Sequence, residues 1–317
     1  MTKNVSTKTI IKIAKEASSL IGLEIKRKAH FGGIGREIKG AIGKGGDLSK
    51  QGDLIAEKVM FKYLSKLIKS NVIDQVILIS EESGIREFNS NTKKKVERSI
   101  FIILDPVDGS NNMRPWRTPR AFVGCSLALG RTSYLKQDPT ISAVEVGWVR
   151  DIFYELDYYA VRGQGSFFKS RDLKRPVKLI TGKMKILSDS IIAVSLDKSL
   201  EKFDKINAKL ESVLRNKKCQ RRLGSTVLDL SKVACGEFDA FISVSGNIKI
   251  HDIAAMKLII EEAGGSFWFH QVRGLENKNY LRELILERKD NFIKDVGFEV
   301  IATGTKSLLK DIQKFLK

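Results

Sequence analysis

The sequence has few of the residues that build disulfide frameworks and histidine-based metal centres. Its cysteines, Cys125, Cys219 and Cys235, are far apart and form no Cys-x-x-Cys pair. Reduced, buried thiols are therefore expected rather than disulfide bonds or a zinc site. The three histidines are scattered over 317 residues, which is too few for a metal centre built on imidazole.

Long apolar segments are also missing. No apolar run approaches the roughly 18 residues that span a bilayer, and the first eight residues contain no apolar signal core. We therefore expect a cytoplasmic protein with no membrane attachment. Hydrophobic residues make up 42% of the 317 residues, which suffices for the packed core of one large domain or two modest ones.

Acidic residues are fewer than basic ones, 37 against 56, and the formal net charge is +19. A positive field attracts anions, whether phosphorylated metabolites or nucleic acid. The basic residues are spread along the chain in short runs such as Lys93–Lys95, and no aromatic residues interleave with them as in a nucleic-acid groove. A solvated lysine-rich surface is the favoured interpretation.

One acidic stretch stands out. The apolar run Phe101–Leu104 predicts a short buried strand that ends at Asp105 and Pro106, because proline has no amide hydrogen for the ladder. Asp108 follows three residues after Asp105, and Gly109–Ser110 permits a tight turn with free amides. Two carboxylates and several amides at a strand end suit a divalent metal ion held together with a phosphate. An ordinary strand-to-turn junction has the same composition.

Periodicity and turn residues predict the remaining elements. Helices are expected over residues 6–29, 53–69, 200–214, 225–235, 252–263 and 305–316. Strands are expected over residues 75–80, 121–130, 141–149, 152–161, 191–195, 238–244 and 298–302. Residues 31–46 are glycine-rich and predict a mobile loop or a plain linker, and residues 85–99 an exposed connection. Strands and helices alternate from residue 186 onward, which indicates a second α/β domain; we expect domains over residues 1–182 and 183–317.

Further acids lie at the ends of these elements. Asp53 and Asp252 each begin a helix, where an N-cap worth about 1 kcal/mol explains them equally well. Glu81 and Glu82 follow a predicted strand, where they are either solvated or part of a site.

Together these pieces resemble one family. An acidic pair after a strand, Asp-Pro-Val-Asp-Gly-Ser at 105–110, and Asp252 opening a helix that ends Glu-Ala-Gly-Gly are similar to the inositol monophosphatase superfamily. Its members are magnesium-dependent phosphomonoesterases, and fructose-1,6-bisphosphatase shares their fold. Residues 43–57, 80–82, 239–247 and 252–255 resemble most the archaeal subgroup that hydrolyses both inositol-1-phosphate and fructose-1,6-bisphosphate. The resemblance implies a layered αβαβα sandwich of the α/β class, assembled as a homodimer or homotetramer.

The same resemblance implies a set of metal ligands. Glu81, Asp105 and the Val107 carbonyl match the ligands of a first ion. Asp105 also matches the carboxylate that bridges to a second ion, which Asp108 and Asp252 would hold.

Catalytic and substrate-binding residues follow in the same way. Asp53, Glu81 and Ser110 match the groups that position the attacking water and an extra, weaker metal ion. Glu82 matches the second glutamate of the motif, interpreted as supporting. Asp108, Gly109, Ser110 and Arg222 form the expected substrate-binding set, in which the Gly109 and Ser110 amides bind phosphate.

Elementary electrostatics agrees with such a site. Like charges about 4 Å apart repel by roughly 4 kcal/mol at an effective dielectric constant near 20, so clustered carboxylates require cations. All-oxygen ligands select Mg²⁺, with Mn²⁺ as the alternative, over zinc. We expect two or three such ions per site and in-line attack by water without a covalent intermediate.

The sequence also departs from the family pattern. Ser110 replaces the usual threonine and keeps its hydroxyl, and His251 stands where many members have tryptophan, which we interpret as a supporting or structural change. The archaeal subgroup's arginine near residue 245 is missing. Arg114, Arg117 and Arg222 are the candidates for a substitute cation.

The leading expectation is therefore a Mg²⁺-dependent phosphatase for a small phosphorylated metabolite, fructose-1,6-bisphosphate, inositol-1-phosphate or both. A phosphatase for a 3′-phosphonucleotide such as adenosine 3′,5′-bisphosphate is the alternative within the same class. From another class, a nucleic-acid-binding regulator with a degenerate phosphatase site would use the charge of +19.

Overall fold

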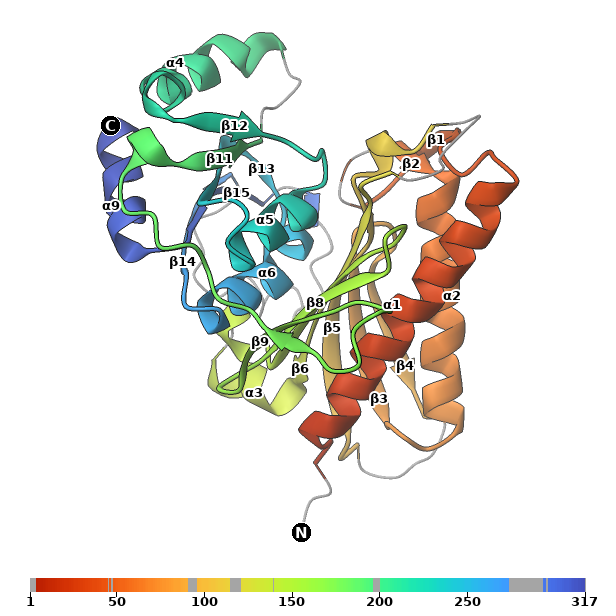
Figure 1. Cartoon of the computed structure of the whole chain (residues 1–317). Coiled ribbons are helices and arrows are strands. Elements are labelled where there is room, and N and C mark those ends of the chain that lie inside the picture. The colour runs from red at the N-terminus through yellow and green to blue at the C-terminus, as the bar shows by residue number, and fades with distance from the viewer. Residues whose placement is uncertain are drawn as a thin grey trace.

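Helical layers alternate with sheets in this chain (Figure 1). The computed structural model describes residues 4–44, 46, 48–90, 96–114, 121–138, 140–195, 200–273, 293–294 and 296–316. Helices α1 and α2 cover one face of a large sheet, α5 and α6 lie between it and a smaller sheet, and α4 and α9 cover the far side (Figure 1). The expected αβαβα sandwich is confirmed.

The helices vary widely in length. The α-helices are α1 (Thr7–His30), α2 (Gln51–Lys69), α3 (Thr132–Gln137), α4 (Leu200–Asn216), α5 (Thr226–Ala234), α6 (Ile250–Glu262) and α9 (Lys306–Phe315). Short 3-10 turns occupy Ser110–Asn112, Ile141–Ala143 and Leu187–Asp189. In the part of the chain that the structure describes, no helix is long and apolar enough to cross a membrane.

The larger sheet has eight strands in the order β10-β9-β8-β7-β6-β5-β3-β4. Its strands are β3 (Gln75–Ser80), β4 (Gly84–Asn89), β5 (Ser99–Asp108), β6 (Gly124–Arg131), β7 (Val146–Asp151), β8 (Leu156–Val161), β9 (Gly165–Lys169) and β10 (Val177–Lys178). β3 and β5 run parallel, whereas the other neighbours pair antiparallel. The carboxyl ends of β3 and β5 therefore meet at one edge of the sheet.

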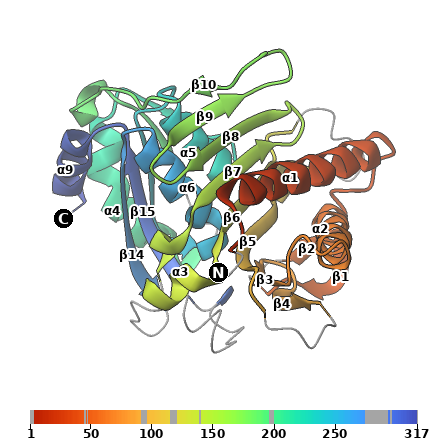
Figure 2. The ribbon, with the colours of Figure 1, turned by 90° about the horizontal axis from the view of Figure 1, so that it is seen from below.

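The smaller sheet has five strands in the order β12-β11-β13-β15-β14. Its strands are β11 (Ile191–Val194), β12 (Cys219–Arg221), β13 (Ala240–Ile248), β14 (Ser266–Arg273) and β15 (Gly297–Thr303). Helix α6 contacts strands of both sheets, and the view from below shows it between them (Figure 2).

Strand β5 shows why the layers hold together. Successive side chains of a strand point to opposite faces. Ile100 and Ile102 pack into the core beneath α1 and α2, while Phe101 and Ile103 pack into the core shared with α5, α6 and the smaller sheet. An uninterrupted apolar run suits this strand because both of its faces are buried.

Some predicted boundaries were wrong. Strand β5 does not end at Asp105 but continues to Asp108, because its ladder with β6 breaks after Asp105 and resumes at Asp108 opposite Gly124. Residues 141–145 precede β7 as a 3-10 turn and a short connection, and residues 152–155 form a turn before β8. Strand β14 was not predicted.

Two segments expected to lack structure form strands. Within the glycine-rich segment 31–46, β1 (Glu37–Ile42) pairs antiparallel with β2 (Leu48–Lys50). The exposed connection 85–99 instead begins with edge strand β4, whose polar residues pair with β3. β1 is largely exposed and β4 is at most half-buried over most of its length, so neither shows the apolar alternation of a buried strand. The division into domains at residue 182 stays a prediction.

Candidate active site

Parallel pairing brings the first two acids together. Ser80, the last residue of β3, lies opposite Leu104 of β5, and the Glu81 amide donates to the Leu104 carbonyl at 3.2 Å. Glu81 and Asp105 therefore leave neighbouring strands at the same level. Asp105 is only 1% exposed, and its Oδ1 accepts a hydrogen bond from the Val107 amide at 3.0 Å.

Two helix N-termini supply further carboxylates. Asp53 and Asp252 are the third residues of α2 and α6, and each accepts a hydrogen bond at 2.7 Å from the backbone amide of the N-cap residue, Lys50 or Lys249. The prediction that these aspartates are themselves N-caps was wrong, because each bonds back to the residue three positions earlier. The positive end of each helix dipole favours a carboxylate there.

Asp108 is fixed by a third helix N-terminus. Its Oδ2 accepts a hydrogen bond from the Val227 amide at 2.9 Å and another from the Ser225 hydroxyl. Ser225 is also the N-cap of α5, where its side chain accepts from the Leu228 amide. Asp108 thus joins the end of β5 to the start of α5.

These acids converge into two overlapping groups. Oxygen or nitrogen atoms of Glu81, Asp105 and His251 lie within 4.8 Å of one another, and so do oxygens of Asp105, Asp108 and Asp252. Asp105 belongs to both groups. Such spacing leaves room for two ions that share one carboxylate, so a divalent metal fits this donor set.

Burial, together with mutual repulsion at Glu81 and Asp105, shifts these carboxylates toward their neutral form. Burial, followed by the charges of Glu81, Asp108 and Asp252, raises the pKa of Asp105 well above its usual range. Burial and then Asp252 do the same to the pKa of Glu81. For Asp108, burial raises the pKa, while the Ser225 hydrogen bond opposes the rise. A bound cation would favour the ionised forms that these pKa shifts oppose.

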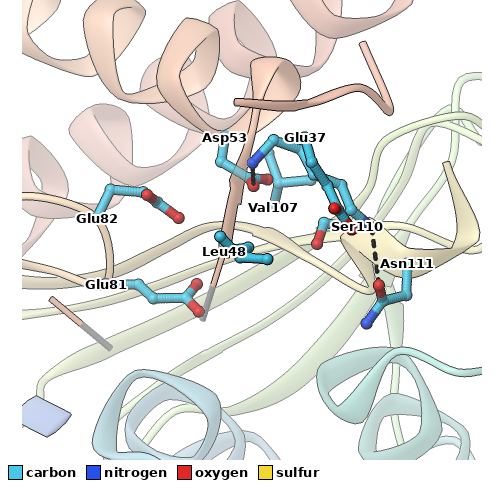
Figure 3. A pocket seen from close by; sticks show the side chains of 9 residues that line it. Glu37, Leu48, Asp53, Glu81, Glu82, Val107, Ser110 and Asn111 are labelled. Atoms are coloured by element: carbon cyan, nitrogen blue, oxygen red, sulfur yellow. Dashed lines mark hydrogen bonds between the residues drawn. The ribbon is translucent and has the colours of Figure 1, made fainter. Parts of the chain in front are cut away.

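A cavity of about 180 Å³ opens beside these acids. It is lined by Glu37, Leu48, Lys50, Asp53, Glu81, Glu82, Val107, Ser110 and Asn111. Figure 3 shows Glu81 and Glu82 on one side and Ser110 and Asn111 on the other, with Asp53 between them. The three residues expected to position a water, Asp53, Glu81 and Ser110, therefore line one cavity.

The expected phosphate-binding turn has the backbone that such a turn requires. Gly109 is left-handed, with φ of 80°, and the 3-10 turn begins directly after it at Ser110. A Cβ atom at Gly109 would lie 2.9 Å from the Phe122 carbonyl oxygen and from the Ser225 Cβ. Only glycine fits this position without strain.

The arginines that were candidates for a substitute cation lie in different places. Arg222 is exposed just before α5. Burial raises the pKa of Asp229, and the charge of Arg222 partly opposes that rise. Arg222 is not among the residues that line the cavity. Arg114 is exposed, and Arg117 lies outside the described residues. The role of Arg222 in substrate binding stays a prediction.

Several residues at the site were not predicted from the sequence. Glu37 and Leu48 come from the β1–β2 hairpin, and the Lys50 Nζ donates to the Asn111 Oδ1 at 2.8 Å. Nothing in their spacing pointed to a cavity, because the hairpin was expected to be a loop. His251, expected to be supporting or structural, lies within the first acidic group.

The layered fold and its acidic pocket place the chain among the αβαβα phosphatases. The model of the inositol monophosphatase family matches residues 141–287. A fructose-1,6-bisphosphatase/inositol-1-monophosphatase of Methanothermobacter thermautotrophicus is 30% identical over 270 residues, which cover 83% of this chain and 82% of the relative. The chain therefore belongs to the inositol monophosphatase family.

Two further proteins are similar to this chain, one in sequence and one in fold. A bifunctional NADP phosphatase/NAD kinase of Methanococcus maripaludis is 32% identical over 231 residues, which cover 71% of this chain but only 37% of that protein. The crystal structure of the extragenic suppressor protein suhB from Bartonella henselae has the same fold. It matches with a TM-score of 0.67 at 22% identity and covers 97% of this chain and 98% of its own.

Proposed function

We propose that this phosphatase-family chain hydrolyses phosphate monoesters of a sugar or of inositol and depends on Mg²⁺ or Mn²⁺. Fructose-1,6-bisphosphate and inositol-1-phosphate are the proposed substrates, and the similarity to the Methanothermobacter enzyme supports both. The observation that carries the proposal is that two clusters of possible metal ligands share one residue, Asp105.

The donor atoms suit hard divalent ions. Glu81, Asp105 and the Val107 carbonyl would hold one ion, and Asp105, Asp108 and Asp252 a second, with Asp53 near a weaker third. Bound ions would acidify a water and neutralise charge on the phosphoryl and leaving oxygens. Oxygen ligands of this kind favour Mg²⁺ or Mn²⁺.

The chain's own groups would orient the reactants. Asp53, Glu81 and the Ser110 hydroxyl face one cavity, where they would hold a water in line with the scissile bond. The Gly109 and Ser110 amides, at the start of a 3-10 turn, would donate to the phosphate oxygens. The oxygen of this water would form a new bond to phosphorus and lose a proton to solvent, while the phosphorus–oxygen bond to the sugar breaks and the leaving alkoxide takes up a proton from solvent.

Phosphate release tests this proposal. Purified protein with Mg²⁺ should release phosphate from fructose-1,6-bisphosphate or inositol-1-phosphate, and excess EDTA should abolish the release. Asp105→Asn keeps the side-chain shape and should lower the rate at least about a hundredfold, a loss of about 2.7 kcal/mol in transition-state stabilisation. Absence of phosphate release from every sugar and inositol phosphate tested would refute the proposal.

Nucleotide phosphates are a second substrate class to test in the same assay. The similarity to the NADP phosphatase/NAD kinase supports nucleotide phosphates such as NADP, beside the adenosine 3′,5′-bisphosphate expected from the sequence. Turnover of all these substrates side by side separates the classes. RNA binding that weakens steeply between two salt concentrations would instead support the nucleic-acid alternative.

A further inference from the structure

A buried imidazole lies against the first acidic group. His251, the second residue of α6, is 3% exposed. Its Nε2 lies 3.8 Å from the Glu81 Oε1 and 4.0 Å from the Asp252 Oδ1. Glu81 directly follows β3, Asp105 lies in β5 and His251 lies in α6, so three separate parts of the fold direct one donor atom each to the same place.

The imidazole lacks the partners that a structural histidine normally has. Within the described ranges, its buried Nδ1 has no hydrogen-bond partner, and Nε2 lies beyond hydrogen-bonding distance of both carboxylates. Buried polar groups in folded proteins nearly always have a partner in the protein, an ordered water or an ion, and an ion between Glu81 and Nε2 would be the partner of the nitrogen that faces the carboxylates. An imidazole that packs only as a substitute for an aromatic ring would have no reason to direct nitrogen toward Glu81.

Imidazole also suits a metal ion chemically. In its neutral form it has a lone pair on one of its two ring nitrogens. Neutral imidazole is the commonest protein ligand for transition metals.

We propose that His251 is a nitrogen ligand of the ion held by Glu81 and Asp105. This inference rests on the proposed function only for the presence of an ion there. Metal–ligand distances of about 2.0–2.2 Å place neighbouring donor atoms about 3 Å apart, so the observed 3.8 Å closes with a side-chain movement of less than about 1 Å. No backbone rearrangement is required.

A mixed nitrogen and oxygen site has a different preference from an all-oxygen one. Imidazole raises affinity for first-row transition ions, whereas Mg²⁺ prefers oxygen donors and retains its waters. The site with His251 therefore binds Mn²⁺ or Co²⁺ more tightly than Mg²⁺. The second site, built by Asp105, Asp108 and Asp252, keeps the preference of its oxygen donors.

Pulsed electron paramagnetic resonance with Mn²⁺ tests the inference directly. Mn²⁺ is added to metal-free protein labelled with ¹⁵N-histidine, and the expected spectrum contains coupling from an imidazole nitrogen. The coupling should vanish in His251→Phe and persist in His270→Phe, a matched change at an exposed histidine. Mn²⁺ affinity, measured by calorimetry, should fall at least about tenfold in His251→Phe, while Mg²⁺ affinity changes less than about threefold.

Absence of nitrogen coupling in the wild-type protein with Mn²⁺ bound would overturn the inference. So would coupling that survives in His251→Phe. If that variant does not fold, the same spectrum of a His30→Phe, His270→Phe double variant decides, because His251 is then the one histidine left among the three in the chain. Protein that shows the coupling but releases no phosphate would refute the proposed function alone, and active protein without the coupling would refute this inference alone.

Discussion

Replacing Asp105 with asparagine should make the metal-free protein more stable. Asp105 lies in both acidic groups, within 4.8 Å of carboxylate oxygens of Glu81, Asp108 and Asp252. Each fully charged pair at that distance would repel by about 3.5 kcal/mol at an effective dielectric constant of 20. Because the raised pKa values leave these acids partly neutral, we expect a net gain of about 1–3 kcal/mol.

The gain is measurable as a melting temperature. An unfolding entropy of about 2.1 cal/mol/K per residue makes 1 kcal/mol equivalent to about 1.5 °C for a chain of 317 residues. Asp105→Asn should therefore melt about 2–5 °C above wild type in EDTA. The asparagine Oδ1 can still accept the hydrogen bond from the Val107 amide, so no contact is lost.

Added Mg²⁺ should reverse this order. An ion at 100 times its dissociation constant stabilises the native wild-type protein by about 2.7 kcal/mol per site, whereas Asp105→Asn should show little response. Asp151→Asn is the matched control, because Asp151 is a buried acid with a pKa raised to about 6, outside the groups that could hold a metal. The reasoning fails if Mg²⁺ stabilises Asp105→Asn as much as wild type, or if the metal-free variant melts below wild type.

Three further substitutions test residues that lie beside the acidic site. Gly109→Ala forces a left-handed residue against the Phe122 carbonyl and should cost about 1–3 kcal/mol in urea unfolding; an unchanged midpoint would contradict that strain. Ser225→Ala removes the cap of α5 and the hydroxyl bonded to Asp108. It should cost about 1 kcal/mol and raise the pKa of Asp108, so calorimetry should show weaker Mg²⁺ binding, and Mg²⁺ binding equal to wild type would refute the link. Burial raises the pKa of Asp229 to about 7. The native state therefore keeps a proton on Asp229 that the unfolded state loses near pH 4. Because the native state binds more protons in this range, stability falls as pH rises from about 4 to about 7. Asp229→Asn should flatten this fall, by at most about 1.4 kcal/mol per pH unit, and an unchanged slope between pH 5 and pH 7 would show that another group causes it.

Local chemistry explains how much of this site could be predicted. A strand buried on both faces needs an uninterrupted apolar run, and Phe101–Leu104 provides one. Pro106 then restricts the backbone, and Gly109 allows the left-handed φ that the turn requires. Glu81 follows from the same logic, because it comes directly after the strand parallel to β5. The order of these acids along the chain carried enough information to identify the family.

Contacts between distant segments could not be predicted from the sequence. The Ser225 hydroxyl meets Asp108 across 117 positions of sequence, and as a sequence feature it was only a helix cap. The β1–β2 hairpin is mostly exposed, so it lacks the apolar alternation that marks a strand. Both N-cap residues, Lys50 and Lys249, are lysines, whereas N-caps are usually small polar residues. The two helices were therefore predicted to begin at the aspartates, later than they do.

Helix α6 ties the two sheets into one folding unit. Its residues Ile253 and Ile260 belong to the same core as Phe101 of the larger sheet and Phe241 of the smaller one. A chain cut between residues 182 and 183 would uncover the face of the larger sheet that packs against α5 and α6, and the apolar sides of those two helices, so neither piece should fold alone. Mixed together, the pieces should reassociate, and tight ion binding would report their reunion, because one piece brings Asp105 and the other Asp252.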